Sequence, residues 1–245
     1  MGFAKDMARR FIIALCSRTK AADMVSHAFM LTPLALQRIS GRGLEVRTIL
    51  DIGASNGRWS LEARKYWPDA RCHLIEANPY HRDSLEMTIR QNPYFSYVLA
   101  AAGASVGTIS FDASDPFGGV ADEKYRDGSR WIEVPVTTID DEVAGNILPK
   151  PFLVKLDTHG FEVPILNGAK ETLKNTNLLV IETYNFDVGS EGLKFYEMCA
   201  FVDQLGFLVI DISEPLWRLK DRAFWQMDLL FVRKDRPEFE YGSYR

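Results

Sequence analysis

The stretch that decides the fold is Ile49-Leu50-Asp51-Ile52-Gly53-Ala54-Ser55-Asn56-Gly57. Its first half is apolar and predicts a buried strand over residues 48–52, and its glycines predict a tight turn into a helix. Because glycine has no Cβ, the backbone can turn sharply at Gly53 and Gly57 and pass close to a ligand. The N–H groups at the start of that helix favour an anionic group. The stretch therefore predicts a nucleotide-type site at the carboxyl end of the first strand of an α/β sheet.

Two acidic residues flank the predicted turn. Asp51 lies just before Gly53, where a carboxylate would repel a pyrophosphate but suits a cationic ligand. Glu76 ends the next predicted strand, residues 72–76, where a carboxylate can accept hydrogen bonds from ribose hydroxyls. The turn reads G-x-x-x-G and lacks the G-x-G-x-x-G pattern of dinucleotide sites. S-adenosylmethionine (SAM) carries an ammonium, a sulfonium and a ribose, so the two acids favour SAM over a nicotinamide cofactor.

Each acid also has a purely structural interpretation, Asp51 as a turn residue and Glu76 as a helix cap. The presence of both acids at predicted strand ends favours ligand binding. The residues expected to contact the donor are Asp51, Gly53, Ala54, Ser55, Gly57, Glu76 and Ala77.

Composition limits the class of protein. The 245 residues are 47% apolar, which is enough for one full core, and the net charge of −4 argues against a nucleic-acid partner. The three cysteines include no C-x-x-C pair, so we expect neither disulfides nor a zinc site, as in a reducing cytoplasm. No apolar run is long enough to span a bilayer. Residues 9–15 resemble the start of a signal peptide, but their apolar segment is too short, and a cytoplasmic protein is expected.

Residues 1–44 lie outside the alternation of strands and helices and predict an N-terminal helical extension with two amphipathic segments. The extension also carries several lysines and arginines, which we interpret as the solvated side of packing helices. Any homodimer contact is expected in this extension. Residues 45–245 predict a single α/β domain. Its Rossmann-like sheet is expected to have seven strands, which are parallel except for one antiparallel strand near the edge.

The expected elements of this domain follow the spacing of apolar runs and of proline and glycine. The expected strands are residues 48–52, 72–76, 95–102, 152–157, 178–182, 207–212 and 227–232, and the expected helices are residues 57–67, 79–91, 161–173 and 193–205. The last two strands follow each other without a helix, which predicts an antiparallel pair.

A small β insertion is expected over residues 103–145, with short strands at 108–112 and 130–136. The loop between them, residues 112–130, is long for a compact domain. Asp115, Gly118 and Gly119 are placed to fold over a ligand, although an inert surface loop explains the composition equally well.

Candidate catalytic residues follow the fourth and fifth strands of the main sheet. Ligands of open α/β sheets bind beyond the carboxyl ends of the strands, where Asp157, His159 and Glu182 are expected to meet. A histidine with a pKa near ~6.5 can act as a base, and we predict Asp157, His159 and Glu182 as the catalytic residues. The alternative for His159 is a turn residue that caps the next helix. Lys155 is interpreted as a strand lysine that an acid neutralises.

The same edge of the sheet also carries residue types that can bind a metal ion. Asp157, His159, Glu182 and Asp228 are ligand types that a metal ion accepts. Their spacing matches no metal motif, so no metal is expected.

Four ordered segments resemble the FkbM-type SAM-dependent methyltransferases over residues 46–233. They are Leu50-Asp-Ile-Gly-Ala-Ser-Asn-Gly57, Ile75-Glu-Ala-Asn-Pro79, Val136-Thr-Thr-Ile-Asp140, and Val154-Lys-Leu-Asp-Thr-His-Gly-Phe-Glu162 followed by Ile165-Leu-Asn-Gly-Ala169. The late Asp228-Leu-Leu-Phe-Val232 also fits.

The resemblance implies a Rossmann-like sheet, SAM as the donor, and O-methylation of a hydroxyl on a small molecule, sugar or glycan-type acceptor. It also implies a donor site formed by Asp51, Gly53, Ser55, Gly57 and Glu76. Two positions depart from the family pattern: Ser55 stands where asparagine is more frequent, and His159 where glutamate or glutamine is common.

Two other functions compete with this prediction. A nicotinamide-dependent oxidoreductase could use a similar fold, but the missing third glycine and Asp51 argue against it. A non-catalytic binding module built on a SAM fold should have lost its donor contacts, and these residues are intact.

Overall fold

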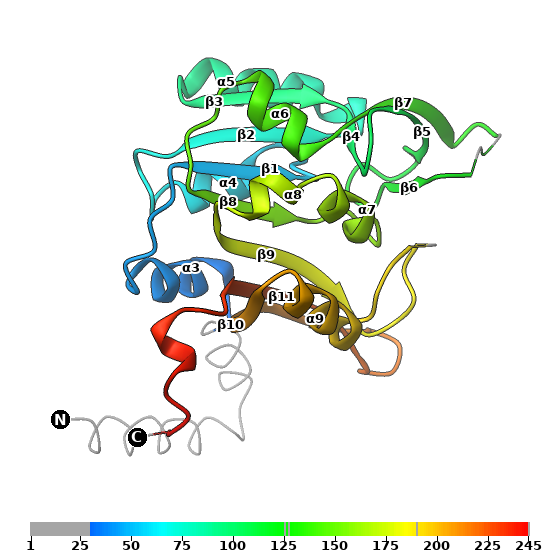
Figure 1. The fold of residues 1–245 in the computed structure, drawn as a ribbon. Coiled ribbons are helices and arrows are strands. Elements are labelled where there is room, and N and C mark those ends of the chain that lie inside the picture. Colours follow the sequence, from blue (N-terminus) through cyan, green and yellow to red (C-terminus); the bar gives the residue numbers. More distant parts are fainter. Residues whose placement is uncertain (1–29, 125, 127, 190, 245) are drawn as a thin grey trace, which may run out of the picture.

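The computed structural model describes residues 30–124, 126, 128–189 and 191–244. Its main sheet has seven strands in the spatial order β3-β2-β1-β8-β9-β11-β10 (Figure 1). These strands are β1 (Thr48–Ile52), β2 (Arg71–Glu76), β3 (Phe95–Leu99), β8 (Phe152–Leu156), β9 (Thr176–Tyr184), β10 (Phe207–Trp217) and β11 (Phe224–Arg233).

One strand of the main sheet runs against the others. β11 is antiparallel to both β9 and β10, whereas β1, β2, β3, β8 and β9 pair in parallel. The predicted Rossmann-like architecture with one antiparallel strand near the edge is therefore confirmed, as is the antiparallel pairing of the last two strands.

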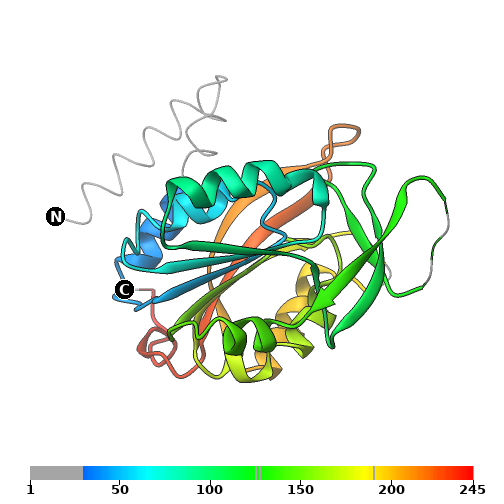
Figure 2. The same cartoon turned by 90° about the horizontal axis from the view of Figure 1, so that it is seen from above.

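Helices cover both faces of this sheet (Figure 2). One layer consists of the helices α3 (Thr32–Ser40), α4 (Arg58–Ala63) and α5 (Arg82–Gln91). The other consists of α6 (Ile139–Gly145), α7 (Glu162–Asn167), α8 (Lys170–Leu173) and α9 (Phe195–Gln204). Single-turn 3-10 helices are η1 (Pro79–His81) and η2 (Pro237–Phe239).

The core is split by the sheet into two parts. Successive side chains of β1 point to opposite faces, so Ile49 belongs to the cluster beneath α3–α5, with Leu36 and Leu85. Leu50 belongs to the cluster beneath α6–α9, with Ile165. Burial on both faces explains why β1 is apolar apart from Thr48 and Asp51.

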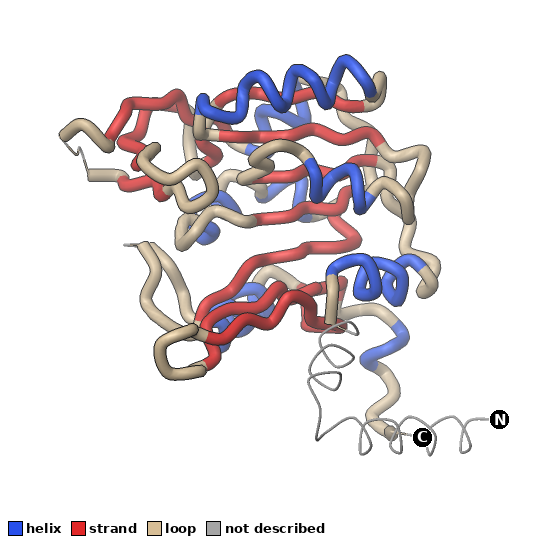
Figure 3. Tube along the Cα trace, turned by 180° about the vertical axis from the view of Figure 1, so that it is seen from behind, coloured by secondary structure: helices blue, strands red, loops and turns tan. Residues whose placement is uncertain are grey.

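A second sheet of four strands lies beyond the carboxyl ends of the main strands, at the right in Figure 1 and the left in Figure 3. Its order is β4-β7-β5-β6, with β4 (Ala101–Ala102), β5 (Gly107–Asp112), β6 (Val120–Asp122) and β7 (Trp131–Thr137). The predicted β insertion is therefore present. It also contains β6, a strand within the predicted loop, because Ala121 pairs with Phe111 of β5.

Two predicted elements differ because of the second sheet. The strand expected over residues 95–102 is divided: β3 pairs with β2, whereas β4 pairs with β7. The helix expected over residues 161–173 breaks into α7 and α8 at Gly168, whose missing Cβ would lie 2.1 Å from the carbonyl oxygen of Gly103. Asp140 then caps α8 by accepting hydrogen bonds from the N–H groups of Glu171 (3.0 Å) and Thr172 (2.8 Å).

The helix expected over residues 57–67 ends early, at Ala63. The chain then turns so that the indole N–H of Trp67 donates to the carbonyl of Leu44 at 2.9 Å. This long-range contact fixes the chain where it enters β1.

Only the last part of the predicted N-terminal extension can be described. α3 packs against β10, and Arg38 of this helix forms an ion pair with Asp211 at 2.7 Å. The remainder, residues 1–29, lies outside the described residues, and so does any dimer contact expected there. None of the helices in the described ranges is both long and apolar enough to cross a bilayer.

Candidate active site

A pocket that is open to solvent lies at the carboxyl ends of β1, β2 and β8, beside the second sheet, and its empty space with the adjoining solvent is about 740 Å³. Its walls come from the glycine turn, from the end of β2, from the turn after β8, and from the loop between β5 and β6. The polar residues and glycines lining it are Gly53, Ser55, Glu76, Asn78, Gly119, Asp157, Thr158 and His159; the apolar ones include Ala77, Ala101, Phe111, Pro116, Phe117 and Phe161.

The glycine turn gives the pocket its shape. Gly53 has φ +74°, and a Cβ there would lie 2.0 Å from the carbonyl oxygen of Asp157. Ser55 also has a positive φ, +49°, and Gly57 has φ +77°. The N–H groups of Gly53 and Gly57 donate within the protein, to Ile75 (2.9 Å) and Ala54 (2.8 Å). The glycines therefore allow the backbone of the turn to pass close to its neighbours, and their own N–H groups are already used within the protein.

Glu76 holds the turn to the end of β2. Its two carboxylate oxygens accept hydrogen bonds from the N–H groups of Ser55 and Asn78, each at 2.6 Å. Burial raises the pKa of Glu76, and these two N–H groups oppose the shift. Each carboxylate oxygen has a second lone pair, so Glu76 can still accept hydrogen bonds from a ligand in the pocket that it lines.

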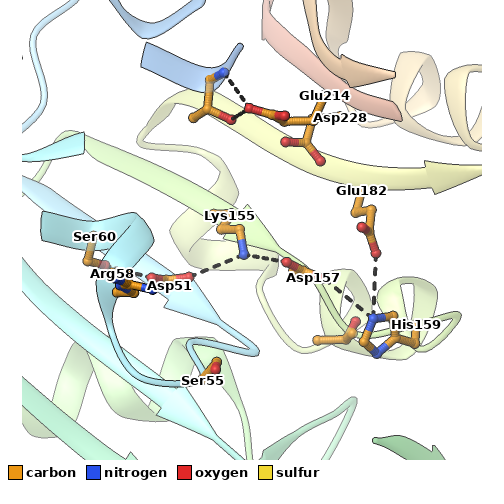
Figure 4. A network of polar contacts seen from close by, with 12 residues as sticks. Asp51, Ser55, Arg58, Ser60, Lys155, Asp157, His159, Glu182, Glu214 and Asp228 are labelled. Atoms are coloured by element: carbon orange, nitrogen blue, oxygen red, sulfur yellow. Dashed lines mark hydrogen bonds and ion pairs between the residues drawn. The ribbon is translucent and has the colours of Figure 1, made fainter. Parts of the chain in front are cut away.

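Asp51 lies beneath the pocket, next to a buried lysine (Figure 4). Ser60 donates to its Oδ2 at 2.7 Å, and Nζ of Lys155 lies 3.7 Å from its Oδ1. Among the described residues, that Oδ1 has no hydrogen-bond partner. Burial raises the pKa of Asp51, and Lys155 opposes this shift.

Lys155 connects Asp51 to the pocket. It is 5% exposed and donates to Oδ2 of Asp157 at 2.8 Å. Burial favours the neutral amine, but the charges of Asp157 and Asp51 outweigh it and hold the pKa of Lys155 above its usual value. For Asp157, burial favours the neutral acid and acts to raise its pKa. The charge and hydrogen bond of Lys155 oppose burial, and the pKa of Asp157 stays below its usual value. The expected pairing of Lys155 with a neighbouring acid is confirmed.

The three predicted catalytic side chains converge at the edge of the pocket (Figure 4). Nε2 of His159 lies 3.8 Å from Oδ1 of Asp157 and 3.7 Å from Oε2 of Glu182. Glu182 accepts hydrogen bonds from the hydroxyl of Tyr184 and the amide of Gln226. Burial and the nearby Asp157 raise the pKa of Glu182 to about 9.

The orientation of His159 is fixed from the opposite side of its ring. Nδ1 lies 3.1 Å from the carbonyl oxygen of Gly119. A carbonyl only accepts, so Nδ1 carries a proton, and in the neutral imidazole the lone pair is on Nε2. The backbone of His159 has φ +52°, and the following Gly160 has φ +94° and no room for a Cβ, which would lie 2.1 Å from the carbonyl oxygen of Val188.

The loop between β5 and β6 is attached to the pocket from two sides. Nε2 of His81 lies 2.7 Å from the carbonyl oxygen of Pro116 and 3.3 Å from Oγ of Ser55. Phe117 of the loop packs on the ring of His81, with centroids 5.4 Å apart. Since Gly119 contacts His159, two histidines hold one loop against both ends of the pocket.

The structure divides the predicted site residues into two sets. Those that line the pocket are Gly53, Ser55, Glu76, Ala77, Asp157 and His159. The predicted residues that do not line it are Asp51, Ala54, Gly57 and Glu182. Asp51 is paired with Lys155, whereas Glu182 reaches the pocket edge through its contact with His159.

Sequence reasoning missed Asn78 as a lining residue and His81 as the anchor of the loop. A signal for both was available, because an asparagine followed by proline is a typical helix start, and the side chain of Asn78 accepts a hydrogen bond from the N–H of Tyr80. The capped turn places His81 beside the glycine turn, and Ser55 is its contact there.

Several solved structures are similar to this chain at low identity. One is the methyltransferase FkbM from Methylobacillus flagellatus KT, with 18% identity and a TM-score of 0.47 over 75% of this chain and 43% of that chain. This chain thus matches less than half the length of that protein. A precorrin-6y C5,15-methyltransferase from Geobacter metallireducens GS-15 has 14% identity and a TM-score of 0.45, over 81% of this chain and 86% of that chain.

A third similar structure is M. capricolum TrmK in complex with S-adenosyl-homocysteine (SAH), with 12% identity and a TM-score of 0.44, over 87% of this chain and 76% of that chain. Among curated proteins, none matches the sequence. A family profile described as the methyltransferase FkbM domain matches residues 51–209, which is more than half of the chain and includes the glycine turn, Glu76, Asp157, His159 and Glu182. The chain belongs to the FkbM methyltransferase family.

Proposed function

We propose that this protein is a SAM-dependent O-methyltransferase whose acceptor is a hydroxyl on a small molecule or sugar. One observation carries the proposal: Glu76, expected at the donor ribose, and Asp157 and His159, expected at the acceptor, line the same pocket. Methyl transfer from a sulfonium is an in-line displacement, so donor and acceptor must meet within one enclosed site.

The donor half of the site rests on Glu76 and the glycine turn. The carboxylate of Glu76 is fixed by two N–H groups and keeps a lone pair on each oxygen for the ribose hydroxyls. The absence of a Cβ at Gly53 leaves the turn in close contact with the backbone of Asp157. In this proposal Asp51 supports the donor site through Lys155, since it lies behind the lining of the pocket.

The acceptor half rests on Asp157, His159 and Glu182. A hydroxyl must lose its proton as its oxygen attacks the methyl carbon. The Nε2 atom of His159 and the two carboxylates are directed at one point on the pocket edge. In the proposed reaction these three side chains face the acceptor oxygen and favour its deprotonation.

Aromatic side chains continue outward from this point. Tyr184 lies next to His159, and Trp225 packs against Tyr184 and stacks on Phe186, with centroids 5.3 Å apart for the stacked pair. The half-buried rings of Phe186 and Trp225 suit the apolar face of a sugar or another ring-shaped acceptor. They support a ring-shaped hydroxylated acceptor.

Calorimetry with SAM and SAH tests the donor assignment. Wild-type protein is expected to bind with micromolar affinity, about −8 kcal/mol. Glu76→Gln and Glu76→Ala should weaken binding at least about tenfold, because a charge-assisted acceptor of the ribose hydroxyls is lost. Glu86→Gln, a change on the exposed side of α5, is the matched control and should bind as wild type.

Absence of SAM and SAH binding to folded wild-type protein would overturn the proposal. A parallel titration with NADH tests the oxidoreductase alternative, which micromolar binding of NADH would favour. A SAM-binding protein that transfers no methyl group to any hydroxylated acceptor, and whose Asp157 and His159 variants bind as wild type, would favour the non-catalytic module.

We also propose a cytoplasmic location. Cys72 and Cys199 are free thiols, as proteins in a reducing compartment carry them. Cys16 lies outside the described residues. Fractionation followed by immunodetection tests this proposal.

A further inference from the structure

We infer that Asp157, His159 and Glu182 together hold a divalent metal ion at the acceptor edge of the pocket. What the ion does there rests on the proposed function; that it binds there rests on the geometry of the three side chains alone.

The three ligand atoms have the spacing of a metal site. One nitrogen and two carboxylate oxygens lie within 4.8 Å of one another. The closest pairs join Nε2 of His159 to Asp157 at 3.8 Å and to Glu182 at 3.7 Å. An ion with bonds of about 2.1 Å can contact two atoms up to about 4.2 Å apart. These pairs are therefore already within reach of one ion, while being too far apart for direct hydrogen bonds.

Each of the three side chains is held by a partner elsewhere in the protein. His159 donates from Nδ1 to the carbonyl of Gly119, which turns the lone pair of Nε2 toward the two acids. Metal-binding histidines are nearly always fixed in this way by their other nitrogen. Lys155 holds Asp157, while Tyr184 and Gln226 hold Glu182. Such outer partners orient ligands before the ion arrives.

The charges around the three side chains also call for a cation. Lys155 is the only lysine or arginine that forms an ion pair with Asp51 or Asp157 within the described part of the chain. Glu182 accepts hydrogen bonds from Tyr184 and Gln226 and lies 3.7 Å from Nε2 of His159, and within the described part of the chain no lysine or arginine pairs with it. Two half-buried carboxylates therefore share one lysine that also faces Asp51. Metal ligands bind as deprotonated groups, so a divalent ion would displace the proton of Glu182 and neutralise both carboxylates.

The site leaves coordination positions open toward the pocket. Three protein ligands are typical of catalytic metal sites, in which water or substrate occupies the other positions. Asp157 and His159 line the pocket, whereas Glu182 lies behind them. The acceptor hydroxyl can therefore approach the ion from the pocket side.

A divalent ion lowers the pKa of a hydroxyl that it binds. The hydroxyl proton then passes to solvent, and the acceptor oxygen forms a bond to the methyl carbon. The C–S bond of SAM breaks, its electron pair passes to sulfur, and SAH leaves. In this arrangement His159 positions the ion rather than accepting the proton itself.

Titration of chelator-treated protein with Mn²⁺ alone, followed by electron paramagnetic resonance, tests the site. Wild type is expected to bind one Mn²⁺ per chain with a Kd in the micromolar range. His159→Asn, Glu182→Gln and Asp157→Asn should each weaken binding at least about tenfold. Glu171→Gln, a change of an exposed carboxylate on α8, is the matched control and should bind as wild type.

His159→Asn is the variant least prone to misfolding. Asparagine tolerates the left-handed backbone at φ +52°, and its amide can still donate to Gly119. Circular dichroism confirms that each variant is folded before it is titrated. Failure of wild type to bind Mn²⁺, or equal binding by all three site variants and the control, would overturn the inference.

Calorimetry with SAH on the same preparations separates the two proposals. Binding of SAH without binding of Mn²⁺ would overturn the metal site and leave the proposed methyltransferase function in place. Binding of Mn²⁺ without SAH or SAM would overturn the function and leave the metal site. Mutual displacement of Mn²⁺ and SAH would show that the three side chains hold the donor ammonium, and would also overturn the metal site.

Discussion

Gly53 and Asp157 are in backbone contact: a Cβ on Gly53 would lie 2.0 Å from the carbonyl oxygen of Asp157. The turn expected to bind the donor therefore packs directly on the turn expected to face the acceptor. The contact exists because β1 and β8 are adjacent parallel strands that end at the same level. Any side chain at position 53 must push the two halves of the pocket apart.

Gly53→Ala should destabilise the protein more than Gly43→Ala. Both glycines have nearly the same positive φ, +74° and +73°, so both substitutions carry the same backbone cost of about 1 to 2 kcal/mol. Gly43 has open space where its Cβ would lie, whereas Gly53 meets Asp157. The steric contact should add about 1 to 3 kcal/mol at position 53. Urea denaturation of both variants measures the difference, and equal losses would contradict the contact.

Lys155→Met should lower the free energy of unfolding by about 3 to 5 kcal/mol, because it leaves the buried charges of Asp51 and Asp157 without a cation. Lys194→Met is the matched control, since Lys194 pairs with the well-exposed Asp187 at 2.5 Å. It should leave the urea midpoint nearly unchanged.

The double variant Lys155→Met/Asp51→Asn should recover part of the lost stability. Removing the charge of Asp51 removes one of the two uncompensated carboxylates. If the double variant is less stable than Lys155→Met alone, the hydrogen bond from Ser60 to the charged Asp51 stabilises the protein more than the unpaired charge of Asp51 destabilises it.

His159→Asn should lower the rate of methyl transfer by about 10² to 10⁴ while SAH binds nearly as in wild type. The variant keeps a donor for Gly119 and loses the lone pair of Nε2 that faces Asp157 and Glu182. Single-turnover kinetics with radiolabelled SAM and calorimetry with SAH measure the two quantities. Turnover at the wild-type rate would remove His159 from the chemistry of the acceptor.

His73 should make the protein less stable as the pH falls below about 6.5. This histidine of β2 is 1% exposed, and its ring nitrogens contact Ser96 (2.8 Å) and Glu142 (2.9 Å). Burial lowers its pKa and outweighs the opposing effect of Glu142. The unfolded chain therefore binds the proton first, and stability is lost from pH 6.5 down to the lowered pKa of the folded state.

Urea unfolding of wild type and His73→Asn between pH 7.5 and about 5 measures this effect. The slope of unfolding free energy against pH should be smaller in the variant. Comparing slopes removes the constant cost of losing the contacts with Ser96 and Glu142. Equal slopes would show that His73 protonates equally in both states.

Local patterns predicted most of the fold. Short continuous apolar runs predicted the strands of the main sheet, because a strand that is buried on both faces needs apolar residues along its whole length. Asn78 and Pro79 marked a helix start through capping chemistry that acts over a few residues. The elements that differed depend on distant partners: β6 exists through β5, and the break at Gly168 exists because Gly103 lies against it.

The candidate site was predictable as a set of residues and not as a set of contacts. Asp157 and His159 lie just beyond the end of β8, and Glu182 lies inside the neighbouring β9 near its carboxyl end. This placement follows from the topology of α/β sheets. The position of Asp51 does not, because the choice between a ligand and Lys155 as its partner depends on where the lysine points across the sheet.

By itself, the sequence determined the order of strands and helices, the glycine turn and the acids at the strand ends, because these depend on neighbours along the chain. The tertiary structure alone decided that His81 and His159 hold the loop over the pocket, and that one nitrogen and two carboxylates face one point. Such arrangements depend on distances of a few ångströms between segments up to 40 residues apart along the chain, and only packing sets those distances.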